Sequence, residues 1–184
     1  MQIRDTAIAD VKLIVPKKFF DDRGEFSETY KRSALAESGI HAEFIQDNRS
    51  LSTRRYTVRG LHYQAAPFAQ AKLVSVQFGR VWDVAVDLRL SSPTFGRSVG
   101  AELTAKGGEQ LLIPAGFAHG FCTLEPDTIV TYKVDNRYAP DQERGLHWLC
   151  DELTIEWPCA ADDAFLAPKD AALPAAIDRA QCFP

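Results

Sequence analysis

Short apolar or alternating segments, each ended by turn residues, dominate the chain between about residue 44 and residue 157. The clearest are Lys72–Phe78, Val81–Leu88, Gln110–Ile113, His119–Leu124 and Ile129–Val134. Their lengths and their content of β-branched and aromatic residues are typical of strands. The Gly, Pro, Asn and Asp residues between them predict turns. Many short strands at this spacing predict an all-β fold, either an antiparallel sandwich or a barrel.

Helical segments are few. The pattern of Ser33–Ser38, which ends at Gly39, predicts one short helix with a serine cap. The alanine-rich segment Lys169–Arg179 contains Pro174, so we expect only a broken helix there. The N-terminal segment Ile3–Phe20 predicts a strand pair or an arm.

The size and charge of the chain limit the possible function classes. A length of 184 residues predicts a single domain over residues 1–184 with short appended arms. The formal net charge of −4 argues against a generic nucleic-acid binder, which would carry a basic stripe. It is compatible with a small anionic ligand, because a few arginines can gather in one cleft.

The cysteines and the N-terminus predict a cytoplasmic protein. Cys122, Cys150, Cys159 and Cys182 form no C-x-x-C pair and are few for a disulfide scaffold, so we expect reduced thiols. The N-terminus has no apolar leader, and no segment approaches the ~20 apolar residues of a membrane helix.

The pattern of histidines argues against a catalytic metal. Such a site needs three or four ligands, and the H-x-H pair typical of metal-binding jelly rolls is absent. His62, taken alone on a strand, is more often a core residue. In a regular strand Arg59 and His62 point to opposite faces. We hypothesise that a bulge at Gly60 brings both side chains toward one cavity.

Several other polar residues have two interpretations. His119 follows the turn Pro114–Gly116 and is either a ligand contact or a turn-stabilising residue. Gln46–Asn48 forms either an Asx-type turn or a polar edge for a base or a sugar. Tyr132 alone would be a core tyrosine, and Lys72 a surface charge. Pattern reasoning therefore indicates an all-β domain with a polar, anion-binding cavity.

A series of short motifs spans nearly the whole chain. They are Asp22–Phe26 with Glu28, Phe44–Asn48, Val58–Gln64, Gln70–Val74, Gly79–Arg89, Ser91–Gly96, Ile113–Phe121, Tyr132–Lys133, Tyr138, Glu143, Ile155–Pro158 and Lys169–Asp170. Together and in this order they resemble the dTDP-4-dehydrorhamnose 3,5-epimerase family. The resemblance implies a double-stranded jelly roll of the cupin type with an N-terminal β arm. It also implies a homodimer without metal or organic cofactor.

The implied reaction inverts C3 and C5 of dTDP-4-dehydro-6-deoxy-D-glucose and gives dTDP-4-dehydro-L-rhamnose. The C4 ketone acidifies the neighbouring hydrogens, so the site needs a base, an acid on the opposite face and a cation at the enolate oxygen. By resemblance His62 is the base, with Asp170 behind it. Tyr132 is the acid, since its ordinary pKa near ~10 keeps it protonated. Lys72 stabilises the enolate oxygen.

The resemblance also implies the residues that bind the nucleotide sugar. Arg23 and Arg59 have guanidinium groups that match phosphate oxygens. The further contacts are Glu28, Gln46, Asp47, Asn48, His119, Glu143 and Lys169. Tyr138 and Phe26 are expected to stack on thymine. In the family the N-terminal region of the partner subunit completes the nucleotide site, so Arg23 or Phe26 is expected to act across the dimer.

Two alternatives stay open at this point. Related enzymes epimerise only C3 or only C5 of another dTDP-4-ketosugar, and the same acid–base set serves them. The second alternative is a non-catalytic sugar-binding jelly roll, because a fold does not determine a function.

Overall fold

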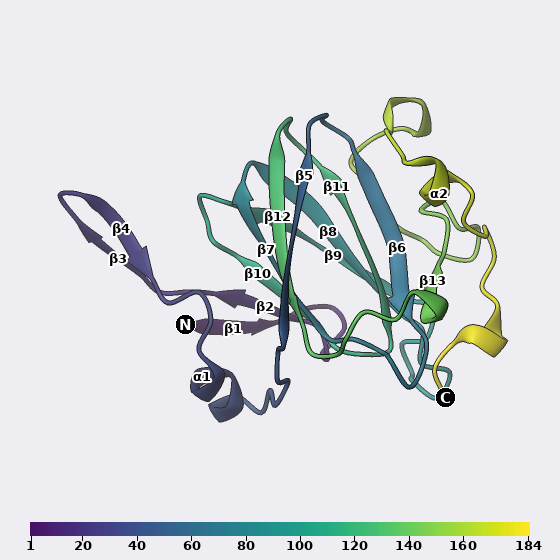
Figure 1. Cartoon of the computed structure of the whole chain (residues 1–184), viewed down its shortest axis with the longest axis horizontal. Helices are drawn as coiled ribbons and strands as arrows, with labels where there is room; N and C mark the ends of the chain where they lie inside the picture. Colours follow the sequence, from purple (N-terminus) through teal and green to yellow (C-terminus); the bar gives the residue numbers. More distant parts are fainter.

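Two antiparallel β-sheets form the body of the molecule (Figure 1). The computed structural model describes residues 1–184. The strands are β1 (Gln2–Asp5), β2 (Lys12–Val15), β3 (Lys18–Asp21), β4 (Gly24–Ser27), β5 (Gln46–Ser52), β6 (Val58–Gln64), β7 (Lys72–Phe78), β8 (Arg80–Asp87), β9 (Ser98–Thr104), β10 (Gln110–Ile113), β11 (Phe117–Thr123), β12 (Thr128–Val134) and β13 (Glu143–Gly145). The helices are α1 (Arg32–Glu37) and α2 (Pro168–Ala171), with short 3₁₀ turns at Pro140–Gln142, Ala161–Asp163 and Arg179–Gln181.

The two sheets share one apolar core. One sheet has the order β1-β2-β10-β7-β12-β5, and the other has the order β13-β6-β11-β8-β9. Side chains alternate between the faces of each strand, so Val74 and Val130 of the first sheet meet Ala85 and Phe121 of the second. Together these features confirm the predicted all-β jelly roll.

The predicted strands agree closely with the observed ones. Lys72–Phe78 and Gln110–Ile113 are observed with the predicted bounds. The other three begin one or two residues earlier than predicted, and β8 and β11 also end one residue earlier. Strand ends depend on pairing with neighbours, which a single segment does not encode.

The helices require one correction. The predicted serine cap is wrong, because α1 begins after Lys31 and no side chain caps its first turn. The predicted broken helix is reduced to the single turn of α2 and a separate 3₁₀ turn near the C-terminus. None of the helices is long and apolar enough to span a membrane.

The N-terminal region supplies both a strand pair and an arm. β1 and β2 pair with each other and extend the six-stranded sheet. β3 and β4 form a separate hairpin that stands away from the body, at the left of Figure 1. Phe19, Phe20 and Phe26 of this hairpin are 49%, 75% and 66% exposed.

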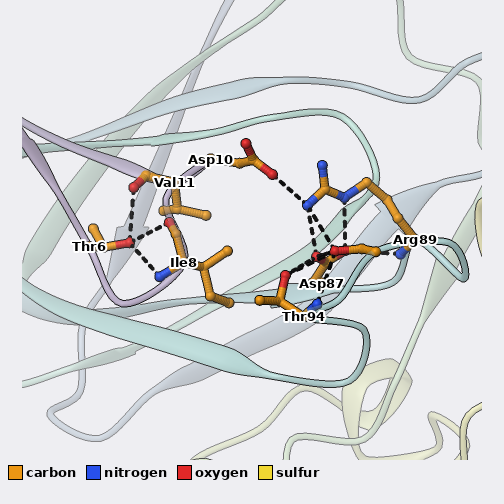
Figure 2. A network of polar contacts seen from close by, with 8 residues as sticks. Thr6, Ile8, Asp10, Val11, Asp87, Arg89 and Thr94 are labelled. Carbon is orange, nitrogen blue, oxygen red and sulfur yellow. Dashed lines mark hydrogen bonds and ion pairs between the residues drawn. The ribbon is translucent and has the colours of Figure 1, made fainter.

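A polar network fastens the loop between β1 and β2 to the end of β8 (Figure 2). Asp87 is fully buried and accepts hydrogen bonds from Arg89, Ser92 and Thr94. Arg89 also donates to Asp10 at 2.7 Å. The Ser92 and Thr94 hydroxyls therefore have a structural use, which is to satisfy a buried carboxylate.

Candidate active site

A cavity of about 740 Å³ is lined by side chains from both sheets and from the C-terminal segment. The predicted site residues that line it are Gln46, Asn48, Arg59, His62, Lys72, His119, Tyr132, Tyr138, Glu143, Lys169 and Asp170. Because β5, β7 and β12 belong to one sheet and β6, β11 and β13 to the other, the cavity brings together residues far apart in sequence.

His62 and Asp170 are hydrogen-bonded across 108 positions of sequence. His62 Nε2 lies 2.8 Å from Asp170 Oδ1, and the Asp170 side chain is 3% exposed. Burial raises the pKa of Asp170, but the hydrogen bond and charge of His62 and the Gly60 N–H outweigh it, so the pKa lies below its usual value. The ionised carboxylate accepts from Nε2–H, which leaves Nδ1 as the basic ring nitrogen.

A bulge at Gly60 turns Arg59 into the same cavity as His62. Between two paired positions of the ladder, β11 advances two residues, from His119 to Phe121, while β6 advances three, from His62 to Arg59. β6 therefore contains one extra residue there, which defines a bulge. Gly60 has φ +103, and a Cβ there would lie 2.6 Å from the His119 carbonyl oxygen. Only glycine fits such a backbone without strain. The hypothesis that Gly60 forms a bulge is therefore confirmed.

Arg59 carries a charge that no carboxylate neutralises by direct contact. Its guanidinium donates to the Ser52 hydroxyl at 3.1 Å and to the Leu51 carbonyl oxygen at 3.0 Å. Both acceptors are neutral, so they orient the guanidinium without cancelling its charge. Such a group in a cavity favours an anionic ligand.

Lys72 and Tyr132 enter the cavity from the six-stranded sheet, opposite His62. Lys72 is 9% exposed, and its ammonium donates to the His62 carbonyl oxygen at 3.3 Å. Burial lowers the pKa of Lys72 to about 8, although the charges of Asp83 and Glu143 oppose this. Burial raises the pKa of Tyr132, so its hydroxyl keeps its proton at neutral pH.

His119 belongs to a second histidine–carboxylate pair. Its Nε2 lies 2.8 Å from Asp83 Oδ1, and both side chains are buried. Burial lowers the pKa of His119, against the opposing effect of Asp83. The hydrogen bond goes to β8 and not to the preceding turn, so the turn-stabilising interpretation of His119 is wrong. Asp83 lies within the apolar segment Val81–Leu88 and is fully buried. An acidic residue in such a segment is a sequence signal for a buried carboxylate that needs a hydrogen-bond partner.

The rim of the cavity carries a connected group of polar residues. The Tyr138 hydroxyl donates to Glu143 Oε2 at 2.9 Å, and Lys169 Nζ lies 3.5 Å from Glu143 Oε1. Burial raises the pKa of Glu143, but the Tyr138 hydrogen bond and the Lys169 charge outweigh it and keep the pKa below its usual value. The rim therefore holds an ionised carboxylate flanked by a phenol and an ammonium.

Four predicted ligand contacts lie outside this cavity. Arg23, Phe26 and Glu28 lie on or next to the β3–β4 hairpin, where Arg23 pairs with Asp21 and Glu28 with Lys31. Asp47 projects from the opposite face of β5 relative to Gln46 and Asn48, and it forms an ion pair with Lys133 at 2.7 Å.

The sequence analysis did not single out several cavity residues. Gln64, Gln70, Thr57 and the segment Phe165–Pro168 line the cavity beside the predicted residues. Gln64 follows His62 by two positions, so strand alternation could have placed it on the same face. Phe165–Pro168 carries no comparable pattern. No cluster of three or more His, Cys, Asp or Glu side chains is arranged to hold a metal ion.

Comparison with known proteins identifies the family of the chain. The model of the dTDP-4-dehydrorhamnose 3,5-epimerase family matches residues 5–178. The Pseudomonas aeruginosa protein named dTDP-4-dehydrorhamnose 3,5-epimerase is 47% identical over 185 residues, which cover 100% of both chains.

Two solved structures are similar over nearly the whole chain. The Bacillus anthracis dTDP-4-dehydrorhamnose 3,5-epimerase with TDP and PPi bound has a TM-score of 0.91 at 47% identity, over 94% of this chain and 98% of that one. The Legionella pneumophila dTDP-6-deoxy-D-glucose-3,5-epimerase in complex with dTDP-4-keto-L-rhamnose has a TM-score of 0.92 at 42% identity, over 99% and 97%. The chain therefore belongs to the dTDP-4-dehydrorhamnose 3,5-epimerase family of isomerases.

Proposed function

We propose that the chain epimerises C3 and C5 of dTDP-4-dehydro-6-deoxy-D-glucose, with His62 as the base and Tyr132 as the acid. The observation that carries this proposal is the His62–Asp170 pair, which faces a cavity whose opposite wall presents Tyr132 and Lys72. A sugar ring between the two sheets would meet a base on one face and a proton donor on the other.

The substrate supplies its own electron sink. His62 Nδ1 removes the proton next to the C4 ketone, the C–H electron pair forms the enolate, and Asp170 stabilises the imidazolium. Tyr132 then donates its proton to the opposite face of the same carbon, which inverts it. The second carbon follows the same sequence once both groups have exchanged protons with solvent. This chemistry requires no redox cofactor.

Lys72 is proposed to stabilise the enolate oxygen. Its ammonium is buried and positioned by the His62 carbonyl, so it needs little reorganisation as negative charge develops. A fixed cation in a buried site stabilises the developing oxyanion more than the neutral ketone. The pKa of about 8 keeps most Lys72 side chains charged at neutral pH.

The nucleotide part of the substrate is proposed to bind across a homodimer in the cytoplasm. Arg59 supplies an uncompensated cation from the same chain, with His119, Gln46, Asn48, Glu143 and Lys169 as further contacts. The exposed phenylalanines of the β3–β4 hairpin suit burial against a second copy. In that arrangement Arg23, Phe26 and Glu28 would reach the partner's cavity. Asp47, on the edge strand β5, would make a further contact with the bound nucleotide sugar.

The test is proton exchange during turnover in deuterated water. We expect NMR of the product to show deuterium at both C3 and C5, and His62→Ala to lose this exchange at both positions. Tyr132→Phe is expected to retain exchange at C5 while losing inversion, because abstraction and reprotonation use different faces. Deuterium at only one of the two carbons would instead indicate a single-position epimerase, and unchanged turnover in His62→Ala would refute the role of His62.

A further inference from the structure

Tyr138 lies at the rim of the cavity in the connection between β12 and β13. Its side chain is 56% exposed, and its only anchor at the phenol end is the hydrogen bond to Glu143. A half-exposed ring in a connecting segment loses rotamer and backbone freedom when it is held in one place. Some other group must therefore fix the backbone of Tyr138 if its ring is to meet a ligand in a defined position.

The side chain of Gln64 holds both peptide groups that flank Tyr138. Gln64 Oε1 accepts from the Ala139 N–H at 2.8 Å, and Gln64 Nε2 donates to the Arg137 carbonyl oxygen at 3.1 Å. The second Nε2 proton goes to the Phe68 carbonyl oxygen at 2.7 Å. Gln64 is 5% exposed, and this carboxamide uses its oxygen and both of its protons.

The same strand carries Gln64 and the proposed base. Gln64 follows His62 by two positions on β6, and both side chains line the cavity. Glu143, which accepts the Tyr138 hydroxyl, is the backbone neighbour of Gln64 in the β6–β13 ladder. The position of Tyr138 relative to His62 is therefore set by one short stretch of β6.

We propose that Gln64 is a positioning residue that fixes Tyr138 over the cavity and thereby contributes to binding of the nucleotide sugar. The inference rests on the proposed function and on the stacking of Tyr138 on the thymine base that the family resemblance implies. Gln64 itself would not touch the reacting atoms. Loss of its carboxamide would leave the Arg137 carbonyl and the Ala139 N–H unpaired and would free the ring.

The experiment is a double-mutant cycle of Gln64→Leu and Tyr138→Ala, measured by steady-state kinetics and by calorimetric binding of dTDP. We expect each single variant to weaken dTDP binding and raise KM about tenfold, the size of one base–aromatic stack, with a smaller change in kcat. The double variant should resemble Tyr138→Ala alone, because Gln64 acts through Tyr138. A general structural role would instead multiply the two losses to about a hundredfold.

The matched control is Gln110→Leu. Gln110 is also 5% exposed, but it lies on β10 outside the cavity, so we expect unchanged KM and dTDP affinity. If circular dichroism shows that Gln64→Leu does not fold, Gln64→Glu replaces it. The carboxylate keeps the acceptor for Ala139 but cannot donate to Arg137, so the same coupling to Tyr138→Ala is expected.

The outcomes separate this inference from the proposed function. Multiplied losses, or unchanged dTDP affinity in the Gln64 variant, would overturn the positioning role. A wild-type protein that binds dTDP but does not epimerise the sugar would refute the proposed reaction, while the dTDP cycle would still decide the role of Gln64.

Discussion

Lys72 shows how far one residue's environment can change its chemistry. In the sequence it opens an apolar strand and resembles an ordinary surface lysine. In the fold its side chain is buried beside His62, and burial lowers its pKa from 10.5 to about 8. The charge that the proposed mechanism needs is therefore lost within an accessible range of pH.

We predict that kcat/KM falls as the pH rises through about 8, because deprotonated Lys72 no longer stabilises the enolate. The charged ammonium dominates below this pKa and the neutral amine above it, so kcat/KM falls and does not rise as the pH increases. Lys72→Arg should lower kcat/KM at pH 7. It should also move the alkaline fall in kcat/KM to higher pH, because a guanidinium stays charged. A wild-type profile that stays flat to about pH 9 would contradict this assignment.

Other site residues were predictable only in part at this scale. Residue type and spacing identified His62, Arg59 and Tyr132 as polar positions on strands, but not their partners. The pairing of His62 with Asp170 depends on chain folding over 108 positions, and it was expected only from the family resemblance. The partners of His119 and Tyr138 are also set by tertiary contacts, which one sequence does not encode.

Elements were more predictable than residues because each strand carries its own pattern. β7 and β10 match their predicted bounds, and Gly60 correctly indicated a bulge in β6. The three-residue strand β13 was not predicted, since its pairing with β6 and not its composition makes it a strand. α1 lacks the predicted serine cap, and its burial of Leu35 against the outer sheet face explains why it forms without one.

The polar network around Asp87, which joins the β1–β2 loop to the end of β8, gives a prediction at the scale of the element. Burial alone would raise the pKa of Asp87, but hydrogen bonds from Arg89, Ser92 and Thr94 lower it from 3.8 to about 2. A lowered carboxyl pKa contributes stability that is fully present above about pH 4 and is lost as the pH falls through about 2. The size of this contribution is about 2 kcal/mol.

We therefore expect Asp87→Asn to lower the free energy of unfolding by about 2 kcal/mol at pH 7 and by progressively less between pH 4 and pH 2. Urea denaturation across this range measures the difference from the wild type. The exposed Asp162 supplies the control, since Asp162→Asn should have little effect at any pH. A difference that stays constant with pH would mean that Asp87 acts through shape and not through its charge.

At the scale of the whole molecule, the hairpin β3–β4 projects from the body, to which Lys18 at its base donates a hydrogen bond at the Lys106 carbonyl oxygen. The sequence indicated an arm here, and Figure 1 shows it standing away from the two sheets. Its exposed aromatic rings and Arg23 lie apart from the cavity that they are proposed to complete. The sequence of one chain cannot show a symmetric neighbour, so the assembly has to be tested by experiment.

Mixed dimers test whether each arm serves the partner's cavity. One subunit carries Arg23→Ala and the other His62→Ala, with different affinity tags, and the two are co-expressed and purified through both tags. In a two-fold dimer with shared sites, one cavity then combines an intact His62 with an intact partner arm, and the other cavity carries both defects. We expect about half of the wild-type turnover per dimer, although each homodimer alone is strongly impaired. If each arm instead served its own cavity, every cavity of the mixed dimer would carry one defect, and turnover would equal the mean of the two impaired homodimers.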